Sequence, residues 1–217
     1  MRRVSAHKTC RYLYMYIVLF LKGHLDQLLR CSQTPLESLA ITECWFSEPE
    51  MEHLFLCPSV SQLKELDLTG ITLSNFNPEP LEVLLENISA TFHILLLKDC
   101  WITDSQLSVI LSALSRCHQL MTFNFCGNQI SKAVLENLLH HTIGLSKLSL
   151  EIYPAPWESY DYEDIYWERF LQLQAETVRG LRLPKRIMFT SYDLEPSPCH
   201  CWELESYMRE LPTQGWL

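Results

Sequence analysis

The chain has 217 residues, of which 47% are hydrophobic and 20% charged, so it can bury a core and falls outside the disordered class. Its formal net charge of −9 argues against nucleic-acid binding through phosphate contacts. Neither glycine-rich phosphate-binding motif, G-x-x-x-x-G-K-[ST] or G-x-G-x-x-G, is present. Nine cysteines, an odd number without tight spacing, favour reduced thiols over a secreted disulfide scaffold.

The N-terminal segment admits two interpretations. Residues 1–11 are basic, and residues 12–21 form an apolar run, as in a signal peptide. The run is rich in tyrosine, lacks a small-residue cleavage site after it, and is too short to span a bilayer. We therefore favour a buried strand bounded by Gly23, and a signal or membrane-surface segment is the alternative.

An apolar pattern recurs five times and fixes the expected architecture. It reads L-x-x-L-x-L-x-x-[NC]-x-L, the pattern of leucine-rich repeats, with starts 25 to 29 residues apart; Ile71 and Tyr153 depart from it at the ninth position. The two leucines of L-x-L share one face of a short strand, and Asn or Cys at the ninth position can reach backbone groups where the chain leaves that strand. The registers start at Leu36, Leu63, Phe92, Leu120 and Leu145. Residues 12–20 can be read as an earlier degenerate repeat with Tyr12 in the first position, followed by a helix over residues 25–30.

Helical periodicity separates these strands. Helices are expected to start at Ser47, Asn77, Thr103 and Ser131, each at a residue that can cap a helix. A unit of one strand and one helix cannot bury its apolar face alone, so the units stack. We predict an α/β fold, a leucine-rich-repeat solenoid that is curved, with parallel strands on the concave face and helices on the convex face.

The rhythm changes after Glu151. Residues 151–168 contain six aromatic and six acidic side chains, which we interpret as an insertion leading into a helix over residues 163–179 and a last strand over residues 186–190. The predicted organisation is a degenerate first repeat (1–35), regular repeats (36–153), the aromatic-acidic insertion with the last repeat (154–195) and a flexible tail (196–217).

Geometry indicates the main candidate binding surface. Strand residues between the core leucines point into the concave face, where repeat proteins bind partners. Their mixture of charged and small polar side chains suits a protein partner. Besides Ala40 and Thr42, the predicted partner-binding residues are Asp67, Thr69, Leu96, Lys98, Asn124, Cys126, Ser149 and Glu151. A second candidate surface is formed by Trp157, Tyr160 and Tyr162, whose rings alternatively only cover the last repeat.

Other motifs favour plain structural roles. Three LxxLL sequences, at residues 25–29, 81–85 and 135–139, could dock on a nuclear receptor, but every helix of a stacked repeat needs such a stripe for the core. Cys199-His200-Cys201 and the pair His140-His141 lack the spacing of a structural zinc site. No local nucleophile motif occurs, so we expect no catalytic residue, metal or cofactor.

Longer phrases carry a family resemblance. They are GHLDQLLRC at residues 23–31, SQLKELDL at 61–68, DSQL at 104–107, FNFCGN at 123–128 and HHTIGLSKLSL at 140–150. Over residues 1–195 the chain resembles the C-terminal part of the PRAME family of leucine-rich-repeat proteins. The resemblance implies a substrate receptor of a cullin-RING ubiquitin ligase and a repressor of transcription, including retinoic-acid signalling. It also implies promotion of proliferation and inhibition of apoptosis and differentiation.

Two departures limit what the resemblance implies. The family's N-terminal half, with its elongin- and cullin-docking box, has no counterpart in this sequence, and the residues after Cys201 differ from the usual family ending. The expected function is therefore a non-enzymatic protein-interaction module in the cytoplasm or nucleus, with neither nucleic acid nor membrane as partner. The alternatives are a secreted or surface repeat protein and a shortened, non-functional paralogue.

Overall fold

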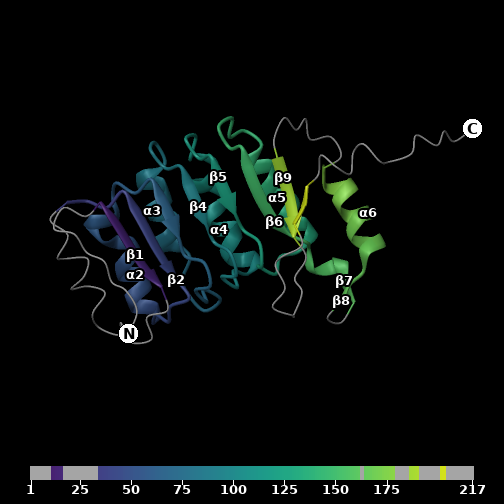
Figure 1. The fold of residues 1–217 in the computed structure, drawn as a ribbon, viewed down its shortest axis with the longest axis horizontal. Coiled ribbons are helices and arrows are strands. Elements are labelled where there is room, and N and C mark those ends of the chain that lie inside the picture. The colour runs from purple at the N-terminus through teal and green to yellow at the C-terminus, as the bar shows by residue number, and fades with distance from the viewer. Residues whose placement is uncertain (1–10, 17–33, 162–163, 179–185, 191–200, 204–217) are drawn as a thin grey trace, which may run out of the picture.

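The structure, a computed structural model, describes residues 11–16, 34–161, 164–178, 186–190 and 201–203 (Figure 1). Its centre is an open sheet in which seven parallel strands follow one another in chain order, and an eighth, β10 (Cys201–Glu203), lies antiparallel to β9. The α/β class and the parallel sheet are as predicted. The parallel strands are β1 (Tyr12–Tyr16), β2 (Ser38–Thr42), β3 (Glu65–Asp67), β4 (Ile94–Leu96), β5 (Thr122–Asn124), β6 (Leu150–Pro154) and β9 (Arg186–Thr190).

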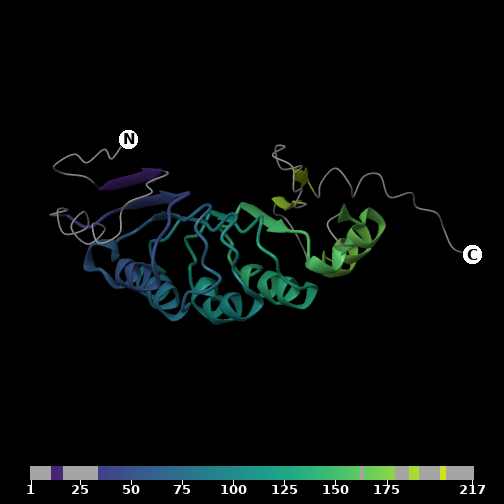
Figure 2. The same ribbon diagram turned by 90° about the horizontal axis from the view of Figure 1, so that it is seen from below.

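Helices cover one face of this sheet. They are α2 (Glu48–Leu56), α3 (Glu79–Ile88), α4 (Asp104–Ser115), α5 (Lys132–Thr142) and α6 (Trp167–Val178). Each helix packs against the next from α2 to α6. Helix α6 also contacts the short helix η2 (Trp157–Ser159). Figure 2 shows the strands on the inner side of an arc and α2 to α5 on its outer side. The opposite face of the sheet carries no described helix, and we call it the helix-free face.

The predicted helix starts at Ser47, Thr103 and Ser131 are confirmed, whereas α3 starts one residue later than expected, after Pro78, and Asn77 Oδ1 accepts a hydrogen bond from the Glu79 amide (3.1 Å). The Glu50 carboxylate accepts a hydrogen bond from the Ser47 amide (2.8 Å), and Ser131 Oγ accepts one from the Val134 amide (3.3 Å). Such bonds satisfy amides that have no partner inside the helix. Thr103 caps α4 in the same way, with Gln106. Helix α6 starts later than residue 163, because β7 (Tyr160–Asp161) and β8 (Asp164–Ile165) form a small antiparallel pair before it.

The repeat pattern sets the core. Leu39, Leu66, Leu95 and Phe123 are in register on neighbouring strands and all are buried against the helices. The expected role of the ninth position is also confirmed: the Nδ2 atom of the buried Asn128 side chain donates to the carbonyl oxygens of Leu97 and Phe125 (both 2.8 Å). Leu66, Leu68, Leu95, Leu97, Phe123 and Phe125, on which the architecture depends, belong to one buried cluster.

The fifth register was assigned wrongly. The amides of Ser149 and Leu150 both donate to the Met121 carbonyl oxygen, just as Met121 and Thr122 donate to the His93 carbonyl oxygen. Leu148, and not Leu145, is therefore the equivalent of Leu120, and the repeat length is again close to that of the others. Consequently Leu150 lies half-buried on the helix-free face, and Glu151 pairs with Phe123 at a core position.

The first register is also shifted. The strand predicted near Tyr12 is confirmed over Tyr12–Tyr16, but Leu13 pairs with Leu39, so Tyr12 is not in the first position of the repeat. Leu13 and Met15 are buried, whereas the three tyrosines that alternate with them are exposed. Alternation sets this register, because it buries the two purely apolar side chains and leaves the phenolic hydroxyls in water. The helix predicted over residues 25–30 lies outside the described residues.

Candidate functional site

The helix-free face is formed by alternate residues of the parallel strands. Its middle row runs across the sheet from Tyr14 to Met188 and is fixed by the strand register. In order along the sheet the row comprises Tyr14, Ala40, Asp67, Leu96, Asn124, Ile152 and Met188. Side chains on this row point away from the helices, since neighbouring residues of a strand face opposite sides.

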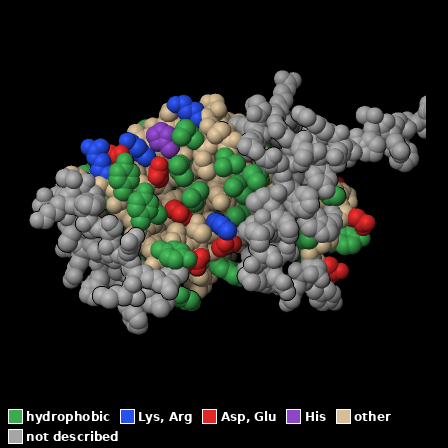
Figure 3. Space-filling view, viewed as in Figure 1, with side chains coloured by type: hydrophobic (Ala, Val, Ile, Leu, Met, Phe, Trp, Pro, Cys, Tyr) green, Lys and Arg blue, Asp and Glu red, His purple; other side chains and the backbone are tan. Residues whose placement is uncertain are grey.

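Hydrophobic side chains occupy much of this face. Ile94 and Leu96 on β4 and Leu150 and Ile152 on β6 are half-buried and flank the polar strand β5. Three tyrosines of β1 stand in a line at one end, 53–55% exposed. Figure 3 shows hydrophobic side chains among acidic and basic ones over the described part of this face. A surface of aromatic and aliphatic groups with interspersed charges has the composition of a protein-binding interface.

Hydrogen bonds within the strands hold the polar groups of this face. Asp67 Oδ1 accepts from the amide and the hydroxyl of Thr69 (2.9 and 2.6 Å). Asn124 Oδ1 accepts from the Cys126 amide in the equivalent position (3.1 Å). Lys98 Nζ lies 3.7 Å from Asp99 Oδ2. The Asp67 and Asn124 side chains are therefore fixed before any partner arrives.

An ion-pair cluster lies where the first strands begin. The Glu37 carboxylate contacts Lys64 Nζ at 3.0 Å and Arg11 Nη1 at 2.5 Å. The hydrogen bond from Lys64, with that from Arg11, holds the pKa of Glu37 below its ordinary value, although some desolvation opposes this. The cluster connects three neighbouring strands at one edge of the helix-free face.

Five of the eight predicted partner-binding residues lie on this face and are half-buried: Asp67, Thr69, Leu96, Lys98 and Asn124. Three are corrected. Ser149 is exposed but sits before β6 starts, where its hydroxyl donates to the Met121 carbonyl oxygen (3.1 Å). Cys126 is buried, because the neighbouring strand β6 extends to Pro154 and flanks it. The third, Glu151, belongs to the core.

Glu151 is 1% exposed and is part of a buried polar group beneath the sheet. Its Oε2 accepts hydrogen bonds from Tyr153 Oη (2.5 Å) and Thr142 Oγ1 (3.1 Å). Burial raises the pKa of Tyr153 well above its ordinary value, and the charge of Glu151 raises it further. These hydrogen bonds explain how an acidic residue occupies a position that Leu or Phe takes in the preceding repeats.

The second candidate surface is divided by the structure. Trp157 is exposed, whereas Tyr160 is half-buried and packs against the core cluster, as the covering interpretation predicts for that ring. Tyr162 lies outside the described residues. The three aromatics are therefore not shown to form one patch.

The LxxLL leucines of two helices are confirmed as core. All three leucines of residues 81–85 and all three of residues 135–139 are buried. The third motif, residues 25–29, lies outside the described residues. A stripe that packs against the sheet is not available to a nuclear receptor in this fold.

No group of three or more potential metal ligands occurs in the described part of the chain. His141 Nδ1 lies 2.8 Å from the Asn137 carbonyl oxygen, and Cys199 and His200 lie outside the described residues. Burial raises the pKa of the Cys117 thiol to about 12 and raises the pKa of Cys100 as well, so neither thiol is an activated nucleophile at neutral pH. Of the described helices, none has the length and apolar character needed to cross a membrane.

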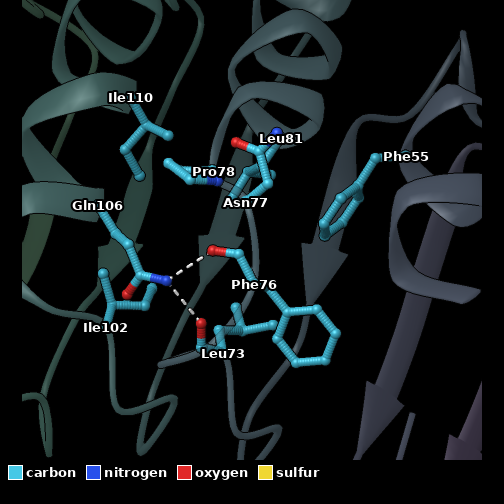
Figure 4. Close-up of a pocket in the computed structure, with 9 residues that line it drawn as sticks. All are labelled: Phe55, Leu73, Phe76, Asn77, Pro78, Leu81, Ile102, Gln106 and Ile110. Carbon is cyan, nitrogen blue, oxygen red and sulfur yellow. Dashed lines mark hydrogen bonds between the residues drawn. The ribbon is translucent and has the colours of Figure 1, made fainter. Parts of the chain in front are cut away.

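One small cavity lies among the helices and loops, with a free volume of about 20 Å³ (Figure 4). Gln106 closes it: Nε2 donates to the carbonyl oxygens of Leu73 and Phe76 (both 2.7 Å), while Oε1 accepts from the Thr103 amide (3.0 Å). The space is about that of a single water molecule, so it is a packing gap and not a ligand site.

Sequence reasoning missed several residues of the helix-free face, chiefly Leu150, Ile152 and the β1 tyrosines. The signal for Ile152 was the repeat spacing, since a start at Leu148 keeps the interval near 28 residues whereas a start at Leu145 shortens it to 25. The signal for the tyrosines was their strict alternation with Leu13 and Met15.

Comparison with known proteins identifies the family of the chain. A family profile described as the PRAME C-terminal domain matches residues 4–206. The chain belongs to the PRAME family. The match extends beyond the residues 1–195 over which the sequence resembles this family.

Curated human relatives support the assignment. The chain is 62% identical to PRAME family member 12 over 202 residues, which is 86% of this chain and 42% of the relative. It is 58% identical to PRAME family member 8 over 204 residues, 87% of this chain and 43% of that protein. PRAME family member 20 is 53% identical over the same share of each chain. The chain thus spans about two fifths of the length of these relatives.

Proposed function

We propose that the chain is a leucine-rich-repeat solenoid that acts as a non-enzymatic protein-interaction module and binds its partner on the helix-free face. Four successive repeats support the solenoid assignment, because in each a residue with positive φ follows the strand within three positions: Glu43, Gly70, Asp99 and Gly127. The amides of the first three residues donate to carbonyl oxygens of the following repeat, each at 2.9 Å. The acceptor is in every case the residue just before the next member of the series: Thr69, Lys98 and Cys126. Stacked units of this kind present one continuous surface.

The observation that carries the binding role is the composition of that surface. Ile94, Leu96, Leu150 and Ile152 line the centre of the helix-free face, although the core on the other side of the sheet is already complete. Apolar groups gathered on an open surface indicate an interaction site. Fixed polar groups such as Asp67 and Asn124 would provide its specificity.

Membership of the PRAME family supports a finer proposal, substrate recognition for a cullin-RING ubiquitin ligase. On this proposal the helix-free face holds the substrate, and the regulation of transcription, proliferation, apoptosis and differentiation follows from which protein is bound. The chain spans about two fifths of its relatives, so recruitment of the ligase is a separate question from substrate binding. The proposed place of action is the cytoplasm or nucleus.

The experiment compares two arginine substitutions in affinity capture from cells. Leu96→Arg places a charge in the centre of the helix-free face, and Val83→Arg places one on the exposed side of α3. We expect proteins captured by the wild-type chain to be lost with Leu96→Arg and kept with Val83→Arg, when circular dichroism shows both variants folded. Equal capture by both variants would contradict binding on this face. Asn124→Arg is a second test on the same surface.

The ligase proposal has its own readout. Co-purification of elongin or cullin with the chain would show that it reaches the ligase, and dependence on Leu96 would place that contact on the helix-free face. Capture of a substrate without either protein would limit the role of this chain to recognition. A fusion of the first 22 residues to a reporter tests the location: secretion and cleavage of the reporter would contradict the cytoplasmic or nuclear proposal.

A further inference from the structure

Two repeats carry the same three-residue sequence type, an acidic residue, Cys and Trp, where their strands end. Glu43-Cys44-Trp45 follows β2, and Asp99-Cys100-Trp101 follows β4. Trp45 is 76% exposed and Trp101 46% exposed. The core does not account for the exposed position of the Trp45 ring.

The middle residue of each triplet sets the direction of the other two. Cys44 and Cys100 are buried, and their thiols donate to backbone carbonyl oxygens, Cys100 to that of Leu68 at 3.1 Å. Glu43 and Asp99 have positive φ of 53° and 54°, so the chain turns sharply there. With the cysteine held inside, the acidic residue and the tryptophan on either side of it reach the surface.

A pocket of about 130 Å³ lies at the first triplet. Its lining includes Glu43, Trp45, Phe46, Gly70 and Thr72. The Glu43 carboxylate lies against Gly70, so close that a Cβ there would meet Oε1 at 2.4 Å. Among the described residues no cation pairs with Glu43. The volume is well below the roughly 300–1,000 Å³ of small-molecule sites and suits the end of one side chain.

The chemistry of this pocket selects a cation. An exposed indole attracts an ammonium or guanidinium group over its face, and a carboxylate beside it adds an ion pair and a charged hydrogen bond. The surrounding repeats are acidic, with thirteen Asp and Glu against five Lys and Arg in residues 36–150. Acidic side chains also lie beside hydrophobic ones along the lower edge of the described surface in Figure 3.

We propose that the Glu43–Trp45 pocket binds a Lys or Arg side chain of a partner protein. Asp99 does not offer an equivalent site, because Lys98 Nζ already lies 3.7 Å from its Oδ2. The proposal rests on the protein-binding role proposed above, and locates a contact at the strand ends in addition to the helix-free face.

Binding of synthetic peptides to the full chain tests the proposal. The probe contains Arg-Pro-Pro, and the comparison peptide contains Glu-Pro-Pro in its place. Isothermal titration should show binding of the probe that weakens with added NaCl and no binding of the acidic peptide. Absence of probe binding up to millimolar concentration, or equal affinity for both peptides, would overturn the proposal.

Variants assign the binding to the pocket. Glu43→Gln keeps the shape and removes the charge, and Trp45→Ala removes an exposed ring; each should weaken probe binding at least about tenfold. The matched control is Trp157→Ala, which removes another exposed tryptophan and should leave the affinity unchanged. Unchanged affinity in Glu43→Gln and Trp45→Ala would overturn the assignment.

The helix-free face is tested separately with Leu96→Arg. This variant should bind the probe peptide with wild-type affinity, although it should no longer capture the proteins that the wild-type chain captures from cells. If the peptide fails to bind while Leu96→Arg still abolishes capture, the inference about the pocket fails and the proposed function stands. If Leu96→Arg leaves capture unchanged while the probe binds, the proposed binding on the helix-free face fails and the inference about the pocket stands.

Discussion

The carboxylate of Asp99 lies directly over Gly127, the residue at the equivalent turn of the next repeat. A Cβ on Gly127 would stand 1.7 Å from Asp99 Oδ1 and 3.2 Å from its Cα, and the φ of Gly127 is +73°. Glu43 lies over Gly70 in the same manner. Acidic residue and glycine thus alternate from repeat to repeat, and each glycine makes room for the carboxylate of the repeat before it.

Gly127→Ala should destabilise the chain. The left-handed backbone costs an L-residue roughly 1–2 kcal/mol, and the displacement of Asp99 adds to this in the free energy of unfolding. The control is Gly144→Ala, where the added Cβ meets nothing within 4 Å and which should change stability by no more than about 1 kcal/mol. Denaturant unfolding measures both. In an Asp99→Gly background the cost of Gly127→Ala should fall, and an undiminished cost would show that Asp99 is not responsible for it.

Asn128→Ala should cost about 3 kcal/mol in the free energy of unfolding. The Asn128 side chain accepts from the Ile102 amide (2.9 Å) and donates to two carbonyl oxygens, so its loss leaves several buried backbone groups without that partner. The neighbouring Gln129 is exposed, and Gln129→Ala should stay within about 0.5 kcal/mol of wild type. Similar effects of the two substitutions would contradict the structural role of Asn128.

The Cys117 thiol should resist alkylation in the folded chain. Burial raises its pKa to about 12, so little thiolate exists at pH 8, and the reagent has no access to it. Cys57 is partly exposed and provides the comparison within the same molecule. Mass spectrometry of iodoacetamide-treated protein should show Cys117 modified at least about tenfold more slowly than Cys57. Denaturant should abolish the difference, and rapid modification of Cys117 without denaturant would be inconsistent with its burial.

Tyr153 should make the fold sensitive to alkaline pH. Burial, with the charge of Glu151, raises the pKa of Tyr153 in the folded chain, whereas in the unfolded chain it ionises near pH 10. The raised pKa therefore contributes stability below about pH 10, and this contribution is lost as the pH rises toward the folded-state pKa. Above pH 10 the free energy of unfolding of wild type should fall by up to about 1.4 kcal/mol per pH unit more than that of Tyr153→Phe. Parallel pH profiles for the two proteins would contradict the burial of the phenol.

The regular repeats could be predicted because the same physical constraint recurs in each. Leu66, Leu95 and Phe123 occupy one register position and meet one another in the core, so any one of them locates the others. Capping residues such as Thr103 and Ser131 located the helices, since the amides they satisfy lie within three residues in sequence.

The prediction failed where a local feature depended on distant partners. The pattern of the fifth repeat could be matched by Leu145, Leu148 and Leu150, and nothing near Glu151 in sequence indicates that it is buried. Its burial depends on the hydroxyls of Tyr153 and Thr142, and Thr142 comes from the end of α5. The same error moved Ser149 and Glu151 onto the predicted binding surface and removed Ile152 from it.

Site-specific photo-crosslinking tests the proposed binding face most directly. A photoreactive residue in place of Thr122, half-buried on β5, is compared with one in place of Val83, exposed on α3. Partner binding on the helix-free face predicts a crosslinked protein from position 122 and none from position 83. Crosslinks that form at position 83 and are missing at position 122 would contradict it.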